Sequence, residues 1–291
     1  MQSGRAIHQA ARARLEVRFF TDWCQERPYA ELHPRFLQAT GRLSSWLEPE
    51  HYDELARVVP IGTGVELPRF VAQDREALRR AGGYEQHVAR YRAVPTRQRS
   101  WHDFFNMAVW AHFPRVRWAL NSIHVDKRLR PIDPRNGRAP EQNVASQLDE
   151  SGIIVASSSR ELLRALRELR FKDVFWQRRD ELLATTRFWI VGHGSLESLL
   201  TPHLGLASKA VLLDLPAPPA SYDPDTLRVA TDERVAAIVH AWRGCVPVLD
   251  PLPLLGIPGF ADNAHPEFYD DARYFRFARR ARSELLLPAQ R

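Results

Sequence analysis

The chain has 291 residues, of which 44% are hydrophobic and 26% charged, so it carries enough apolar side chains for a sizeable core and is not disordered as a whole. Its 14 glycines, 21 prolines and two cysteines exclude collagen-like and disulfide-rich scaffolds. The chain has 41 basic and 35 acidic residues and therefore a formal charge of +6. This modest positive charge permits nucleic acid as a partner without requiring it.

The first 83 residues read as a helical extension. Helical patterns cover 7–26, short pieces within 29–59 and a longer stretch over 74–92, with a strand at 68–71. Gly82 and Gly83 interrupt the helical stretch over 74–92. We expect residues 1–83 to pack on a core of residues 84–279, with 280–291 as a C-terminal tail.

Two consecutive helices follow. Ser100 is a good N-cap and Asp103 stands three residues later, which approximates a capping box. This helix should end near His112, because Phe113 precedes Pro114 and residues before proline avoid the helical region. Pro114 suits the first turn of a second helix over 114–125. Residues 126–152 are charged and rich in proline, and we predict a long loop there.

The remainder alternates short elements with turns. We predict strands at 153–156 and 210–215, helices at 158–170, 172–187 and 231–243 with caps at Ser158 and Thr231, and a proline-punctuated tail from 246. The fold class expected is α+β, predominantly helical with a few short strands, in a single compact domain. No βαβαβ rhythm is present, so a doubly wound dinucleotide fold is not indicated.

Polar side chains cluster on the first two predicted core helices. His102 and Asn106 are separated by four residues, and Asn121 and His124 by three, so each pair shares a helix face. The break at Pro114 could bring the pairs together. They would then form either a pocket with histidine as general acid or base, or a hydrogen-bonded brace between two helices.

A second cluster is Gly192-His-Gly-Ser-Leu-Glu197. If His193 is helical, Glu197 lies one turn away, a spacing that suits two metal ligands or a histidine–carboxylate pair. If the chain turns at the glycines, His193 is a loop residue. No glycine follows two residues after Ser195, so a nucleophile elbow is excluded, and a third glycine for dinucleotide binding is absent.

The sequence motifs do not identify a cofactor. Neither Cys-x-x-Cys nor His-Glu-x-x-His occurs in the chain. A divalent metal would therefore need ligands that are distant in the sequence, such as His102, His124 and His193.

An ordered series of motifs resembles the bacterial domain-of-unknown-function family DUF3025. The series comprises Val94-Pro-Thr-Arg97, Ser100-Trp-His-Asp-Phe-Phe-Asn106, Phe113-Pro-Arg115, Asn121 with His124, Phe175-Trp-Gln-Arg-Arg179, Gly192-His193 with Glu197 and Pro202, Leu255-Gly-Ile-Pro-Gly259, and Phe268-Tyr269 with Phe275-Arg276. The resemblance runs from about Tyr84 to Arg276 and implies a bacterial, cytoplasmic, single-domain protein, with no activity attached. Gly194 and Arg117 depart from the residues usual in that family.

We interpret the chain as an enzyme, a hydrolase or group transferase, that acts on a small polar or anionic substrate. His102, Asp103, His193 and Glu197 would be catalytic, and Arg97, Asn106, Asn121 and His124 would bind substrate. The alternatives are a nucleic-acid-binding module using the Arg-rich segment 115–138, whose seven basic and two acidic residues sum to +5, and a non-catalytic interaction domain. Without a signal peptide or a long apolar stretch, we expect a cytoplasmic protein with no membrane contact; the oligomeric state is open.

Overall fold

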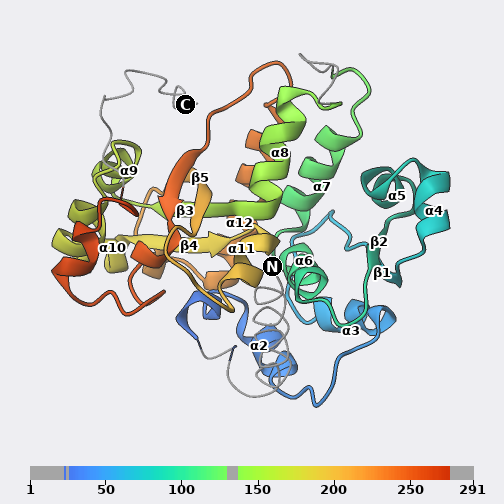
Figure 1. Ribbon diagram of the computed structural model, residues 1–291, viewed down its shortest axis with the longest axis horizontal. Coiled ribbons are helices and arrows are strands. Elements are labelled where there is room, and N and C mark those ends of the chain that lie inside the picture. The colour runs from blue at the N-terminus through green and yellow to red at the C-terminus, as the bar shows by residue number, and fades with distance from the viewer. Residues whose placement is uncertain (1–22, 24–25, 130–136, 276–291) are drawn as a thin grey trace, which may run out of the picture.

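A four-stranded mixed sheet and the helices around it make up most of the computed structural model, which describes residue 23 and residues 26–129 and 137–275 (Figure 1). The helices are α2 (Pro34–Thr40), α3 (Tyr52–Ala56), α4 (Arg75–Ala81), α5 (Tyr84–Tyr91), α6 (Trp101–His112), α7 (Pro114–His124), α8 (Pro140–Ser151), α9 (Arg160–Arg167), α10 (Arg179–Thr185), α11 (His193–Ser198) and α12 (Pro224–His240). The strands are β1 (Arg69–Ala72), β2 (Ala93–Thr96), β3 (Gly152–Ser157), β4 (Thr186–Ile190), β5 (Ala207–Asp214) and β6 (Asp250–Pro253).

The central sheet has the strand order β4-β3-β5-β6. β3 pairs in parallel with β5 and antiparallel with β4, and β6 runs antiparallel to β5. All six residues of β3 are buried, as expected for an inner strand covered on both faces. A separate pair, β1 and β2, is parallel and lies beside α4 and α5 (Figure 1). The prediction of a predominantly helical α+β domain with few short strands is confirmed.

Helices α6 and α7 form where their sequence signals place them. The Ser100 hydroxyl accepts the Asp103 backbone N–H, and Pro114 opens α7 directly after Phe113. Nearly every residue of α6 is buried, so this helix runs through the core rather than over it. Its aromatic side chains pack on a residue of the N-terminal region, because Trp23 makes edge contacts with Trp101, Phe104 and Phe105.

The long helix α12 packs against α7 and caps it. Asp232 accepts the backbone N–H groups of Arg115 and Val116 at 3.0 and 2.9 Å. A carboxylate at a helix N-terminus pairs otherwise unsatisfied donors and favours the positive end of the helix dipole.

The prediction of a loop over 126–152 is wrong for its second half, because 140–151 form α8. The helix has Pro140 in its first turn, and the side chain of Gln142 accepts the Ala139 backbone N–H at 2.9 Å. Val144 and Leu148 bury one face of an otherwise polar helix. So few apolar residues gave a weak periodic signal, and the prolines preceding the helix favoured a loop.

Other boundaries also differ. The helix expected over 231–243 begins at Pro224 with Asp223 as its cap, whose carboxylate accepts the Thr226 N–H. The helix expected over 172–187 ends at Thr185, because β4 starts at the next residue. The cap of α9 is Ser159, one residue later than expected.

Both ends of the described chain pack on the core. The Tyr29 hydroxyl donates to the Leu196 carbonyl at 3.0 Å, and the Tyr274 hydroxyl donates to that of Leu206 at 2.6 Å. The tail 280–291 and nearly all of the expected helix 7–26 lie outside the described residues. Among the residues that are described, we find no helix with the length and hydrophobicity needed to span a bilayer.

Candidate functional site

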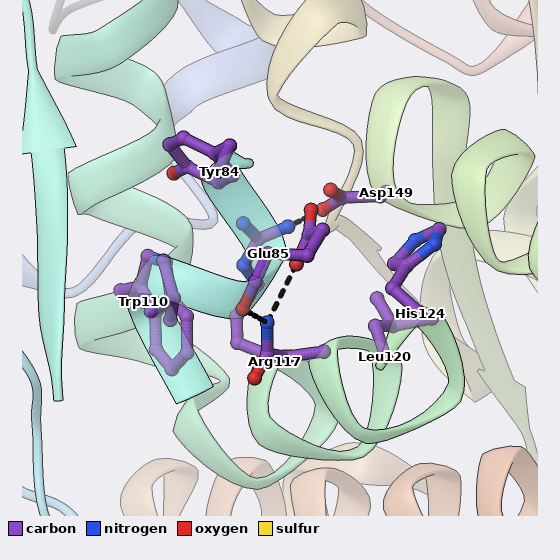
Figure 2. A pocket seen from close by; sticks show the side chains of 9 residues that line it. Tyr84, Glu85, Trp110, Arg117, Leu120, His124 and Asp149 are labelled. Carbon is purple, nitrogen blue, oxygen red and sulfur yellow. Dashed lines mark hydrogen bonds and ion pairs between the residues drawn. The ribbon is translucent and has the colours of Figure 1, made fainter. Parts of the chain in front are cut away.

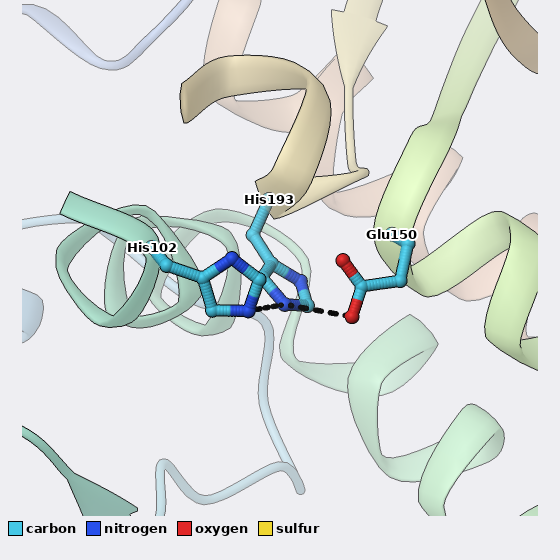
Figure 3. Close-up of side chains that lie close together, drawn as sticks. All are labelled: His102, Glu150 and His193. Atoms are coloured by element: carbon cyan, nitrogen blue, oxygen red, sulfur yellow. Dashed lines mark hydrogen bonds and ion pairs between the residues drawn. The ribbon is translucent and has the colours of Figure 1, made fainter. Parts of the chain in front are cut away.

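Two histidines from distant parts of the chain meet beside α8. His102 lies in the first turn of α6 and His193 is the first residue of α11. Their Nε2 atoms are 3.0 Å apart, and the rings meet edge to face with centroids 4.3 Å apart (Figure 3). The two histidines are 91 residues apart in the sequence, and they meet because α6 and α11 pack against each other.

Each histidine also has a carboxylate near its other ring nitrogen. The Nδ1–H of His102 donates to Oε2 of Glu197 at 3.1 Å. The Nδ1 of His193 lies 3.6 Å from Oδ1 of Asp149, beyond hydrogen-bond distance. His193 is helical, so Glu197 does lie one turn further along α11, but its carboxylate contacts His102 rather than His193.

The two imidazoles differ in how readily they take up a second proton. The hydrogen bond to Glu197 raises the pKa of His102 and so favours its protonated form. Burial, aided by the nearby positive charge of Arg117, lowers the pKa of His193 to about 3 and keeps that ring neutral. Of the two rings, His102 is therefore the one that favours a second proton, and when it is protonated its Nε2–H donates to the Nε2 of a neutral His193.

Glu150 completes this group, as Figure 3 shows. Its Oε1 lies 3.6 Å from Nε2 of His193, and one ligand atom from each of His102, Glu150 and His193 falls within 4.8 Å of the others. Two zinc–nitrogen bonds of about 2.0–2.1 Å at a tetrahedral angle place their nitrogens about 3.3 Å apart, close to the spacing seen. These three residues, called the His–His–Glu site below, have the geometry to hold a divalent metal ion.

Asn106, Asn121 and His124 lie elsewhere, around a buried arginine, Arg117. Asn106 bonds to Arg117, whereas Asn121 and the half-buried His124 line a pocket together with it. Arg117 donates from Nη2 to Oδ1 of Asn106 at 2.7 Å and forms an ion pair with Asp149. Asn121 donates to the backbone and side-chain oxygens of Glu85 at 3.0 and 2.6 Å. Figure 2 shows Arg117 and Asp149 facing each other in this pocket.

The two predicted pairs therefore do not form one pocket. His124 lines the pocket beside Arg117, whereas His102 points to His193. Asn106 is a hydrogen-bonded brace, since it accepts from Arg117 and donates to the Tyr84 hydroxyl at 2.9 Å. The network nevertheless contacts the His–His–Glu site, because Asp149 faces both Arg117 and His193.

Asp103 and Arg97 pair with each other. The Nε and Nη2 atoms of Arg97 donate to the two carboxylate oxygens of Asp103 at 2.9 and 2.7 Å, and its backbone N–H donates at 2.6 Å. Asp103 is buried, while about half of the Arg97 side chain is exposed. The pair anchors the segment that leads into α6, and hence the position of His102.

The sequence reasoning missed Asp149, Glu150 and Arg117. The two acidic residues lie in the part of α8 that was expected to be a loop, and Arg117 was counted with the surface charges of 115–138. Two signals were available: Val144 and Leu148 are spaced for a buried helix face, and Arg117 sits in α7 between the buried Val116 and Ala119. Arg117 is 4% exposed, which removes it from any nucleic-acid-binding surface.

Comparison with known proteins gives a family but no activity. No curated protein and no solved structure matches the chain. The family model described as "Protein of unknown function (DUF3025)" matches residues 68–279, a range that contains α6, α8 and α11. The chain therefore belongs to the DUF3025 family.

Proposed function

We propose that this protein is a metal-dependent hydrolase or group-transfer enzyme, with a divalent transition metal, zinc in the first instance, bound by His102, His193 and Glu150. The observation that carries the proposal is the convergence of two Nε2 atoms and one carboxylate on a single point, with Nε2 atoms 3.0 Å apart. Two imidazoles and one carboxylate form a ligand set used by hydrolytic zinc enzymes.

The orientation of the rings supports a cation at this point. Each Nδ1 faces a carboxylate, Glu197 for His102 and Asp149 for His193. The hydrogen bond to Glu197 puts hydrogen on Nδ1 of His102, and the carboxylate beside Nδ1 of His193 favours the same tautomer there. Both Nε2 lone pairs would then be aimed at the same place. Two lone pairs 3.0 Å apart repel unless a positive charge lies between them. A proton serves in the metal-free protein, and a metal ion would displace it.

The exposure of the site favours a catalytic rather than a structural metal. Structural zinc sites are closed by four protein ligands, whereas catalytic ones leave a position for water or substrate. Here three ligands are present, and the side chains of His102, Glu197 and Glu150 are 30%, 43% and 55% exposed. A fourth position can therefore be reached from solvent.

The chemistry follows from that open position. A divalent metal held by His102, His193 and Glu150 would lower the pKa of a water bound to it and so supply a nucleophile near neutral pH. The protein's own contribution is to fix the ligands: Glu197 orients His102, and the α6 and α11 backbones set the spacing of the rings. Arg97 is half exposed and is held in place by its pair with Asp103, so its exposed part would bind an anionic group of the substrate.

The test combines metal analysis with an activity panel. The purified full-length protein would be stripped with chelator, reloaded with Zn²⁺, Mn²⁺ or Fe²⁺, and assayed on chromogenic carboxylic esters, phosphomonoesters, phosphodiesters and amides. We expect stoichiometric binding of one metal and metal-dependent hydrolysis of one substrate class. His102→Ala and His193→Ala should each lower that rate at least about 100-fold, whereas His203→Ala, at an exposed histidine outside the site, should not.

Two results would overturn the proposal. The first is a wild-type protein that binds none of the three metals above background. The second is a metal-loaded wild-type protein that hydrolyses no substrate class faster than His193→Ala does. That result would favour the non-catalytic alternative.

A further inference from the structure

Asp149 occupies a position that links the two polar groups of the molecule. It lies near the end of α8, with its side chain only 13% exposed. Its Oδ1 faces Arg117 on one side and Nδ1 of His193, at 3.6 Å, on the other. This nitrogen is buried and has no hydrogen-bond partner among the described residues, so the carboxylate beside it is the acceptor that a small movement would bring into range.

Arg117 holds this carboxylate from behind. Its side chain is 5% exposed, Nη2 is fixed by Oδ1 of Asn106 at 2.7 Å, and Asn106 is itself fixed by the Tyr84 hydroxyl. A buried guanidinium with a planar fork cannot turn away without leaving its own charge and that of Asp149 unpaired. The orientation of the carboxylate is therefore set by a chain of partners on α5, α6 and α7.

We propose that Arg117 and Asp149 are positioning residues that fix the tautomer and ring orientation of His193, so that its Nε2 presents a lone pair to the metal. The inference rests on the proposed metal site. Arg117 touches neither metal nor substrate; it acts through Asp149, and Asp149 acts through His193. Ligating histidines commonly have such a carboxylate at their other nitrogen, and its loss lowers metal affinity by about 10- to 100-fold.

The two histidines are supported unequally. Glu197, behind His102, is 43% exposed and solvent can replace it, whereas Asp149 is buried where water has little access. The Asp149 side is therefore the one whose loss the site cannot compensate. This asymmetry also explains why so polar a network is buried: it is the support of a ligand.

The direct test needs no substitution. Two-bond ¹H–¹⁵N correlation spectra of the metal-free wild-type protein distinguish a histidine protonated on Nδ1 from one protonated on Nε2. We expect the His193 signals to show hydrogen on Nδ1 and a bare Nε2. A bare Nδ1 would overturn the inference, and it would do so whether or not the protein binds metal.

Variants measure the consequence for the metal. Competition with a chromophoric chelator should show Zn²⁺ binding weakened by about 10- to 100-fold in Asp149→Ala, and partly restored in Asp149→Asn, which keeps an oxygen. Glu141→Ala, which removes a carboxylate from the first turn of the same helix, is the matched control and should bind like wild type.

The outcomes separate this inference from the proposed function. Unchanged Zn²⁺ affinity in Asp149→Ala and Asp149→Asn, together with a lowered melting temperature, would mean that the pair is only structural. If Asp149→Ala does not fold, the inference is tested by the tautomer of His193 in the wild-type spectrum and by the Zn²⁺ affinity of Asp149→Asn. A wild-type protein that binds no metal would remove the proposed function, while the tautomer would still be measured.

Discussion

His112 should make the protein lose stability as the pH falls from 7 to 5. It lies at the end of α6, 1% exposed, and both ring nitrogens are used. Nδ1–H donates to the Ala108 carbonyl at 2.6 Å, and Nε2 accepts the His33 backbone N–H at 2.8 Å. A second proton would have to go on Nε2, where it would meet that N–H.

The magnitude follows from proton linkage. Burial lowers the pKa of His112 from 6.5 to about 3, so between these values the unfolded chain binds a proton that the folded chain does not. The contribution of His112 to the free energy of unfolding is therefore fully present above pH 6.5 and is lost as the pH falls below that value. The loss between pH 7 and pH 5 is about 2 kcal/mol for this one group.

The variant His112→Phe isolates the effect, because other titrating groups are common to both proteins. At pH 7 the variant should be less stable by about 1–2 kcal/mol, since the His33 N–H loses its acceptor. At pH 5 the two proteins should be about equally stable. Urea unfolding followed by tryptophan fluorescence at pH 7, 6 and 5 gives both free energies. A difference that stays constant across this range would refute the reasoning.

Three further predictions concern the site. Asp103→Asn should lower the free energy of unfolding by about 1–2 kcal/mol in urea titrations, because it breaks a buried bidentate pair with Arg97; an unchanged value would mean that solvent replaces the pair. Gly192→Ala should yield a protein destabilised by about 3 kcal/mol or more, because the new Cβ would overlap the backbone at the start of β3, and a normal melting temperature would contradict this. Zn²⁺ affinity should fall as the pH drops through the raised pKa of His102, because the ligand must lose its proton, and Glu197→Gln should move this fall to lower pH in chelator competition.

Local signals predicted the helices that carry the first histidine. Ser100 as a cap and the Phe113-Pro114 junction fix the ends of α6 and the start of α7, so His102 and Asn106 were placed on one helix face from the sequence. These signals act within one or two turns, and local rules describe them well. The same rules placed Glu197 one turn from His193 once that residue is helical.

The partners of each histidine lay beyond such rules. Glu197 and His102 are 95 residues apart in the sequence, and His193 and His102 are 91 apart. Only the packing of the whole fold brings such residues into contact. The acidic residues of α8 were missed for a local reason, since its polar sequence hid a narrow apolar face. As a result, the predicted cluster contained both histidines but lacked the carboxylate, Glu150, that completes a ligand set.

The two glycines beside His193 explain how these distant pieces come together. A Cβ at Gly192 would overlap backbone atoms of Ser151 and Gly152, and one at Gly194 would lie 2.8 Å from Oε2 of Glu150. Because neither glycine has a side chain, the start of α11 packs directly against the end of α8. The pattern Gly-x-Gly therefore serves close packing between two elements rather than a phosphate or dinucleotide. Because this close approach sets the spacing of His193 and Glu150, the proposed metal site depends on both glycines.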